Sequence, residues 1–353
     1  MTVKILGAGL SGLSCAINLA GEREVKVYEK RKDVGEQIHP NLQGIGYGGS
    51  AATDFFRKVN IPLPENTRKF NKVFLLTPKR DISLNLSEPY TFVFRGGKNS
   101  FEYQLYQQAL KMGVEVVFNS TVKEENADVI ATGPKHADVV AFGGAYENTS
   151  FPDDSMLIMF DDRFSPKGWY FYIIPRGDGM VDAINCTPAI YAKKSRQLLE
   201  KAIKERALIR ELMDGARLSS SFSSYGNGFI RESAVIDGRL YVGEAAGFQD
   251  PMMGFGMKYA LTSGYLAAKS ITSGEDYDAL WRSEIMPQMK NDIARRELFS
   301  IVGSRLIERL YRDIDSGTLS SLPNPKASGL SLSVFEDALY RLGCAKKRFL
   351  GYW

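Results

Sequence analysis

Near its start the chain carries Val3-Lys4-Ile5-Leu6-Gly7-Ala8-Gly9-Leu10-Ser11-Gly12. The first four of these residues read as a short buried strand. The apolar residues from Leu10 to Leu19 recur near helical spacing, which predicts a helix to about Ala20. Val25–Glu29 reads as a second strand that ends in an acid. Together these segments predict a β-α-β unit of the size that a parallel crossover needs.

The glycines of Gly7-x-Gly9-x-x-Gly12 have separate tasks in such a unit. Gly7 permits a tight turn, Gly9 lets the backbone approach a pyrophosphate, and Gly12 lets the helix pack closely on the sheet. The pyrophosphate then lies on N–H groups at the positive end of the helix. Glu29 can accept the hydroxyls of an adenosine ribose and would repel the 2′-phosphate of NADP. The predicted dinucleotide contacts are Gly7, Ala8, Gly9, Leu10, Ser11, Gly12, Glu29 and Lys30.

Composition and charge exclude several classes of protein. Of the 353 residues, 44% are hydrophobic and 24% charged, and the net charge of +4 is too small to imply a nucleic-acid partner. Three cysteines far apart and only two histidines predict neither a metal site nor a disulfide framework. No apolar run is long enough to span a bilayer, and the first strand leaves no room for a secretion signal. We therefore expect a cytoplasmic protein.

The order of the predicted elements indicates two interleaved domains. Segments typical of a parallel sheet alternate along the chain with segments typical of an antiparallel one. The fold class expected is α/β, with a Rossmann-like dinucleotide-binding domain interrupted by an antiparallel-sheet substrate domain. The expected parts are 1–68, 100–150 and 236–275 for the first domain, 69–99 and 151–235 for the second, and 276–353 for a helical C-terminal region with a loop at 316–331.

A second glycine-rich segment, Arg239–Met257, favours FAD over NAD. A predicted strand is followed by Gly243 and Glu244, and a loop then leads into a helix. The start of that helix can direct free amides at a partial negative charge, such as the N1/C2=O region of a reduced flavin. The acid can hold ribityl hydroxyls, whereas simple NAD dehydrogenases have no use for this second pole. The contacts predicted here are Gly243, Glu244, Pro251, Gly254, Gly256 and Met257.

Several motifs together resemble the FAD-dependent geranylgeranyl reductase family, within the hydroxylase-like flavoproteins. They are Gly7–Gly12 with Glu29, Ala131-Thr132-Gly133-Pro134 at the end of a strand, Gly243–Gly256, and the aromatic segment Ser165–Pro175. The resemblance covers about residues 1–275. It implies further FAD contacts at Ala131, Thr132 and Gly133.

The chain departs from the pattern of that family at three places. The usual aspartate of the Gly-Asp motif is Glu244, and the aromatic strand reads Tyr170-x-Tyr172-x-Ile174-Pro175 in place of Tyr-x-Trp-x-Phe-Pro. A Cys-Gly-Gly-Gly-like loop is replaced by Gln43-Gly44-Ile45-Gly46-Tyr47-Gly48-Gly49, which has no cysteine.

The resemblance implies an oxidoreductase that reduces C=C bonds of geranylgeranyl or other polyprenyl lipids. The aromatic segment would then line an apolar cavity, although alternating aromatic residues also suit two packed faces of a sheet. The predicted lining residues are Trp169, Tyr170, Tyr172, Ile174 and Pro175.

No catalytic residue is assigned by the sequence. The candidates for a proton donor are His39, Tyr170 and Tyr172, although a surface loop position is the favoured explanation of His39. Arg95 and Gln104 are candidate pyrophosphate contacts, with a solvated position as the alternative for each.

Two other flavoprotein functions remain open. A monooxygenase or halogenase-like enzyme would consume oxygen with its substrate, whereas an electron-transfer flavoprotein would only pass electrons between partners. A second G-x-G-x-x-G with its own β-α-β unit is absent, so electrons are expected from an external donor such as NAD(P)H or a ferredoxin-like protein. The basic and aromatic end, Cys344–Trp353, either rests on a lipid surface as a peripheral membrane contact or docks on its own domain.

Overall fold

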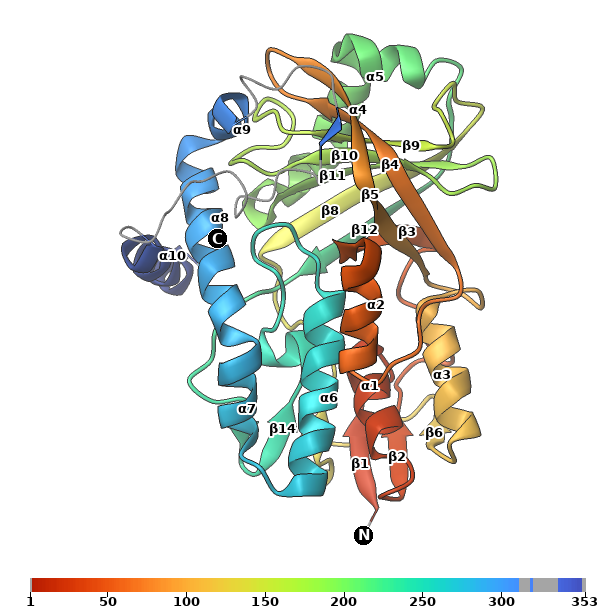
Figure 1. The fold of residues 1–353 in the computed structure, drawn as a ribbon, viewed down its shortest axis with the longest axis vertical. Coiled ribbons are helices and arrows are strands. Elements are labelled where there is room, and N and C mark those ends of the chain that lie inside the picture. Colours follow the sequence, from red (N-terminus) through yellow and green to blue (C-terminus); the bar gives the residue numbers. More distant parts are fainter. Residues whose placement is uncertain (1, 311–317, 320–335, 351–353) are drawn as a thin grey trace. The chain divides into compact units, whose positions relative to one another are not determined.

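The computed structural model describes residues 2–310, 318–319 and 336–350 (Figure 1). The chain folds into two compact units. Unit 1 consists of residues 1–67, 91–136 and 226–292, and unit 2 consists of residues 68–90, 137–225 and 293–353. Most of the loop expected at 316–331 lies outside the described residues.

Unit 1 is built on a largely parallel sheet, with the strand order β13-β14-β7-β1-β2-β6. β1 lies in its interior and pairs in parallel with β2 and β7. Only β13 runs antiparallel to its neighbour, β14. The bounds are β1 (Val3–Leu6), β2 (Val25–Tyr28), β6 (Glu115–Val117), β7 (Val129–Ile130), β13 (Val235–Ile236) and β14 (Arg239–Tyr241). The parallel pairing confirms the predicted Rossmann-like fold.

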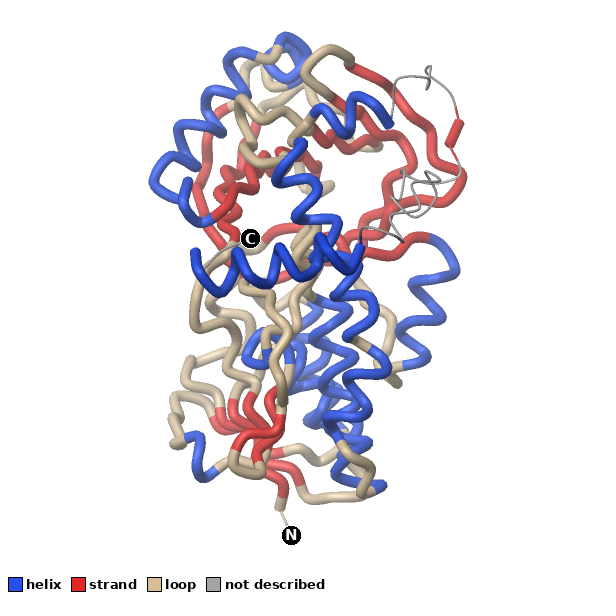
Figure 2. Tube along the Cα trace, turned by 90° about the vertical axis from the view of Figure 1, so that its left-hand side faces the viewer, coloured by secondary structure: helices blue, strands red, loops and turns tan. Residues whose placement is uncertain are grey.

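Helices pack around this sheet. Figure 2 shows its short strands gathered beside them. α1 packs on α6, where the Ser14 hydroxyl donates to the carbonyl of Leu261 at 2.8 Å. The bounds are α1 (Leu10–Leu19), α2 (Gly49–Lys58), α3 (Phe101–Lys111), α6 (Met257–Ser273), α7 (Tyr277–Glu284) and α8 (Met286–Val302), with short 3-10 turns η1 (Glu124–Asn126) and η3 (Gly243–Ala246). Leu10, Leu13, Ile17 and Leu19 of α1 are all buried, as the helical spacing predicts.

Unit 2 is built on a long, mostly antiparallel sheet, with the order β12-β8-β11-β10-β9-β4-β5-β15. The strand β3, which belongs to unit 1, also pairs with β5, whose last residues, 91–95, belong to unit 1 as well. Two pairs are parallel, β4 with β9 and β15 with β5, so the expected antiparallel sheet is in fact mixed. The bounds are β3 (Asn41–Gly48), β4 (Thr67–Leu76), β5 (Asp81–Arg95), β8 (Val139–Glu147), β9 (Ser155–Met159), β10 (Phe171–Pro175), β11 (Val181–Pro188), β12 (Arg217–Gly226) and β15 (Thr318–Leu319).

One face of that sheet is covered by helices that the sequence did not predict. Phe171 and Ile173 of β10 pack with Leu199 and Ala202 of α4 and with Ile209 of α5 in one buried cluster. The helices of the unit are α4 (Ser195–Glu205), α5 (Ala207–Leu212), α9 (Arg305–Leu310) and α10 (Glu336–Leu350), with the 3-10 turn η2 (Ala189–Lys194).

The expected division of the chain differs from the observed units in several places, and two of these differences can be traced to a specific contact. Residues 137–150 were expected with the dinucleotide-binding domain, but β8 pairs with β11 along its whole length and so lies in unit 2. Residues 276–292 were expected in a separate helical region, but they lie in unit 1, where the ring of Trp281 on α7 packs 5.2 Å from that of Phe248. In both cases the partner is distant in sequence, which local patterns do not reveal.

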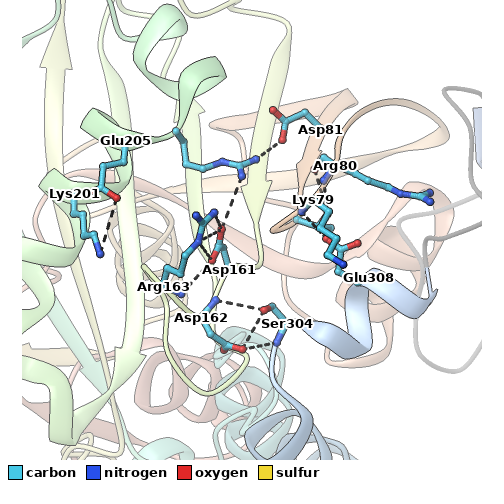
Figure 3. Close-up of polar contacts among 12 residues, drawn as sticks. Lys79, Arg80, Asp81, Asp161, Asp162, Arg163, Lys201, Glu205, Ser304 and Glu308 are labelled. Atoms are coloured by element: carbon cyan, nitrogen blue, oxygen red, sulfur yellow. Dashed lines mark hydrogen bonds and ion pairs between the residues drawn. The ribbon is translucent and has the colours of Figure 1, made fainter.

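A buried ion-pair network holds three segments of unit 2 together (Figure 3). The carboxylate of Asp161, after β9, accepts two hydrogen bonds from the Arg163 Nε and one of 2.6 Å from its Nη2. Arg206, between α4 and α5, lies 3.9 Å from the same carboxylate and also pairs with Asp81 at the start of β5. The side chain of Asp161 is 1% exposed, so water screens these contacts little.

Asp161→Asn is expected to lower the free energy of unfolding by about 2–3 kcal/mol. The reason is that Arg163 and Arg206 lose the negative charge that they share. The matched control is Glu205→Gln, which removes an ion pair with Lys201 that is 4.0 Å long and about half exposed. That control should change stability by less than about 0.5 kcal/mol. Urea unfolding measures both. Equal losses in the two variants would contradict a structural role for the buried network.

Candidate flavin site

Four parallel strands of unit 1 end at one edge of the sheet, and each is followed by a predicted site segment. The N–H of Gly7 donates to the carbonyl of Tyr28 at 2.8 Å, and that of Ala131 donates to Leu6 at 2.8 Å. The N–H of Val242 donates to Ile130 at 3.0 Å. These bonds place the starts of the 7–12, 29–31, 131–133 and 243–256 segments side by side. Ligands of open α/β sheets bind at this edge.

Gly7 and Gly12 of the first motif have the close backbone contacts that a tight turn and close helix packing require. Gly7 has φ +111°, a conformation that favours glycine, and a Cβ there would collide with the backbone of Ala131. A Cβ on Gly12 would collide with the carbonyl of Gly7. Gly9 differs from both, because no heavy atom of the described residues lies within 4 Å of a Cβ built there. Space therefore adjoins Gly9, at the start of α1.

The carboxylate of Glu29 lies beside the turn of Gly7–Gly12. One of its oxygens accepts the N–H of Ala8 at 2.9 Å, and the other accepts the N–H of Arg31 at 3.0 Å. The two bonds fix the carboxylate beside the glycine turn. Each carboxylate oxygen has a further lone pair, so the group can still accept ribose hydroxyls. Lys30, the neighbouring predicted contact, is exposed.

The helices α1 and α6 of unit 1 each have a glycine as N-cap. Gly9 is the N-cap of α1 and Gly256 is the N-cap of α6, and no side chain among the described residues caps either helix. By contrast, α3 is capped by the hydroxyl of Ser100, which accepts the N–H of Tyr103. The first N–H groups and the dipoles of α1 and α6 thus suit an anionic or partly negative ligand. This fits a pyrophosphate at one helix and a flavin carbonyl region at the other.

The two glycine-rich segments pack against each other. A Cβ on Gly243, which has φ +58°, would lie 2.7 Å from the hydroxyl oxygen of Ser11. Gly264 of α6 lets that helix approach α1, since a Cβ there would lie 2.9 Å from the nitrogen of Cys15. The structure therefore brings residues 7–12 and the start of 243–256 together within unit 1. Leu10 and Met257, both predicted contacts, are buried in this region.

The loop between η3 and α6 is held by its own side chains. Asp250 accepts the N–H of Met252 at 2.8 Å and that of Met253 at 3.2 Å, which orders the turn around the buried Pro251. Gly254 has φ +78° and Gly256 packs on the amide of Gln249. Glu244, which stands in place of the usual aspartate, accepts the N–H of Asn227 at 3.1 Å. The longer side chain thus binds the backbone that precedes this loop.

An aromatic ring that the sequence did not single out lies beside this loop. A Cβ on Gly44 of β3 would lie 2.9 Å from the ring of Phe255, and one on Gly46 would lie 3.4 Å from the Phe255 Cβ. The two glycines therefore let Phe255 pack closely on β3. The segment that replaces the Cys-Gly-Gly-Gly-like loop thus contacts the turn before α6.

Arg95 lies in a buried polar cluster. Its Nε pairs with Glu102 on α3, and its Nη1 donates to the Gln43 amide oxygen at 2.9 Å. The second oxygen of Glu102 is buried without a hydrogen-bond partner among the described residues, which leaves an acceptor for a ligand hydroxyl or a water. Sequence patterns missed Glu102, although an acid in the first turn of an amphipathic helix was a visible signal.

The remaining candidates of unit 1 are Gln104, His39, Thr132 and Gly133. Gln104 donates to the carbonyl of Leu63 at 2.8 Å and accepts the N–H of Glu65 at 2.9 Å, so its amide anchors a loop. His39 is half-buried, with Nδ1 3.1 Å from the carbonyl of Pro40. Thr132 is exposed, and Gly133 has φ +81°.

The aromatic candidates lie in unit 2. The rings of Trp169 and Tyr170 stack 6.4 Å apart, and Tyr172 lies 5.8 Å from Tyr170. Strand alternation puts Tyr172 and Ile174 on the face opposite Phe171 and Ile173. Pro175 follows the other parity, so it does not share the face of Tyr172 as the lining hypothesis expects. Burial strongly raises the pKa of the Tyr172 phenol, which keeps it protonated.

The basic C-terminal helix contacts its own unit. Lys346 on α10 donates to Glu297 at 2.9 Å and to the hydroxyl of Ser300 at 2.7 Å, while Lys347 pairs with the buried Asp138. Burial lowers the pKa of the Lys347 ammonium. Two of the three cations near this end thus bind acids of unit 2, as the docking alternative requires. Within the described residues, no helix is long and apolar enough to cross a membrane.

A family model for an NAD(P)-binding Rossmann-like domain matches residues 5–56. A digeranylgeranylglycerophospholipid reductase 2 from Methanothermobacter thermautotrophicus is 27% identical over 185 residues, which are 48% of this chain and 45% of that protein. A digeranylgeranylglycerophospholipid reductase from Methanococcus vannielii is 24% identical over 210 residues, covering 54% and 53%. The chain spans about half the length of the curated relatives it matches.

Solved structures share the fold along nearly the whole chain. A geranylgeranyl bacteriochlorophyll reductase-like protein from Thermoplasma acidophilum has a TM-score of 0.76 at 16% identity, covering 95% of this chain and 99% of that one. The resemblance to the geranylgeranyl reductase family is confirmed. A flavin-dependent brominase has a TM-score of 0.66 at 16% identity, covering 98% and 94%. The solved structures with this fold thus include a reductase-like protein and flavin-dependent halogenases.

Proposed function

We propose that the chain binds FAD and reduces C=C bonds of geranylgeranyl or other polyprenyl lipids. The observation that carries the proposal is the packing of two glycine-rich segments, at Ser11 and Gly243, each leading to a helix whose start, at Gly9 or Gly256, has no side-chain cap among the described residues. Relatives of the chain are named as reductases of digeranylgeranyl lipids. A protein that binds a mononucleotide, or a simple NAD dehydrogenase, needs only the helix start at Gly9. FAD, with a pyrophosphate and a ring system, uses both.

Each pole has a distinct task in this proposal. Glu29 would bind the adenosine ribose, and the N–H groups at the start of α1 would bind the pyrophosphate. The N–H groups at the start of α6 would stabilise the negative charge that the ring carries when reduced. When bound, the flavin supplies the hydride that an alkene carbon accepts. The chain orients the two reactants and keeps the neutral phenol of Tyr172 among the apolar side chains of its sheet face.

The substrate class is proposed from the relatives and from the apolar character of that face. Tyr172 lies between Ile158 and Ile184 in the register of β9, β10 and β11, whereas Ile174 lies opposite Asp182, which is paired with Arg176. The apolar part of this face, around Tyr172, suits an isoprenoid chain. The electron donor is proposed to be an external nicotinamide or a ferredoxin-like protein.

The deciding experiment is anaerobic turnover of the flavin-loaded chain, reduced chemically, on digeranylgeranylglycerophospholipid. Mass spectrometry should show products that gain two hydrogens for each double bond reduced. The flavin-free chain is the matched control and should give no product. Unchanged lipid with a chain that holds reduced flavin would contradict the proposed reaction.

A halogenase or other monooxygenase is the second candidate, and the brominase and halogenase neighbours favour it. It predicts that the reduced chain consumes oxygen in the presence of substrate and forms a peroxyflavin spectrum. The same protein preparation, opened to air with and without halide, distinguishes this outcome from the anaerobic reduction of lipid.

A further inference from the structure

A buried carboxylate, that of Asp292, joins α8 to the first turn of α6. Asp292 is 4% exposed. One of its oxygens accepts the hydroxyl of Tyr259 at 3.1 Å, and the other accepts the amide of Gln288 at 2.7 Å. Tyr259 belongs to the first turn of α6, the helix end proposed to face the flavin. Asp292 is thus bound directly to that helix end.

A second buried carboxylate, that of Asp250, belongs to the turn that precedes α6. Asp250 is 5% exposed and orders the turn by accepting two backbone N–H groups. Two buried carboxylates in one neighbourhood repel each other when both are charged. The loop before α6 and the helix α8 are therefore coupled by charge as well as by packing.

The protonation state of Asp292 follows from these neighbours. Burial, and then the charge of Asp250, raises the pKa of Asp292 to about 6. The groups that act in the opposite direction are Lys258 and Tyr259 of α6 and Gln288 of α8, which favour the charged form. The carboxyl group of Asp292 therefore changes its charge near neutral pH. A modest change in the local electric field is enough there to change its protonation state.

We propose that Asp292 is a positioning residue that takes up a proton when the flavin at the start of α6 is reduced. The inference rests on the proposed function, because it requires a flavin ring at that helix end. A hydride donor adds two electrons and one proton to the ring, which then carries one negative charge. That charge favours the neutral form of Asp292, so solvent supplies one further proton to its carboxylate. When the hydride passes to the substrate, Asp292 releases this proton again.

The flavin-free chain tests the titration itself. Infrared spectra across pH should show one carboxyl group that loses its proton near pH 6, and Asp292→Asn should lack this signal. Tyr259→Phe removes a hydrogen bond to the charged form, so it should move the midpoint upward by about one pH unit, whether or not Asp292→Asn folds. The matched control is Asp237→Asn, which changes an exposed carboxylate paired with Arg239 and should leave the signal unchanged. No carboxyl titration near pH 6 would overturn the inference.

The flavin-loaded chain tests the link to reduction. Between pH 6 and 8, reduction of the wild type should take up one more proton per two electrons than reduction of Asp292→Asn. The midpoint potential of the wild type should therefore fall more steeply with pH, by about 30 mV per pH unit. Equal slopes in a chain that binds flavin would overturn this inference and leave the proposed function standing. A chain that binds no flavin would overturn both, and the infrared titration would still show whether Asp292 is protonated.

Discussion

Gly9→Val is expected to abolish flavin binding and to leave the fold intact. No heavy atom of the described residues lies within 4 Å of a Cβ at this position, and the φ of −80° suits any residue. The isopropyl group would occupy the space proposed for the pyrophosphate, and the N–H groups of α1 would lose their ligand. We expect the dissociation constant for FAD to rise at least 100-fold, which is about 2.8 kcal/mol.

The comparison with Gly12 makes this test sharp. A Cβ on Gly12 would collide with the carbonyl of Gly7, so Gly12→Ala should lose flavin binding and thermal stability together. Gly9→Val should lose flavin binding alone, with an unchanged circular dichroism spectrum and melting temperature of the flavin-free chain. Flavin retention in a folded Gly9→Val protein would contradict a pyrophosphate at the start of α1.

Glu29→Gln is expected to weaken FAD binding by about 10- to 100-fold, because it replaces charge-assisted hydrogen bonds to the ribose by weaker ones. The glutamine keeps one acceptor oxygen for the N–H of Ala8 or Arg31, so the turn itself should persist. Binding of FMN, which has no adenosine, should not change. Fluorescence titration of the flavin-free chain with FAD and with FMN measures both affinities.

The exposed Glu22 provides the matched control for Glu29. Glu22→Gln removes the same charge from unit 1 and should leave both affinities within about twofold of the wild type. Equal affinity of Glu29→Gln and the wild type for FAD would place the adenosine elsewhere. A parallel loss of FMN affinity would instead show that Glu29 acts on the fold of the turn.

The sequence was most informative where the structure depends on local geometry. The turn at Gly7 needs a positive φ, and the strand at Val25–Tyr28 needs alternating burial, so both leave a direct mark on residue types. The parallel sheet and the strand ends of unit 1 were therefore predictable.

Unit 2 and the polar interior of unit 1 were less predictable. β8 is placed by its pairing with β11, about 40 residues away, and its sequence alone carries no sign of that partner. Phe255 packs on Gly44 and Gly46, and Asp292 meets Tyr259, because elements distant in sequence pack together. Such contacts depend on tertiary structure, which single-sequence patterns do not encode.

The most direct measurement is a crystal structure of the chain with FAD bound. Our account predicts the adenosine ribose on Glu29, the pyrophosphate at the start of α1 beside Gly9, and the isoalloxazine ring against Pro251–Met257 at the start of α6. An FAD molecule whose adenosine and ring lie away from these two helix starts would contradict the account.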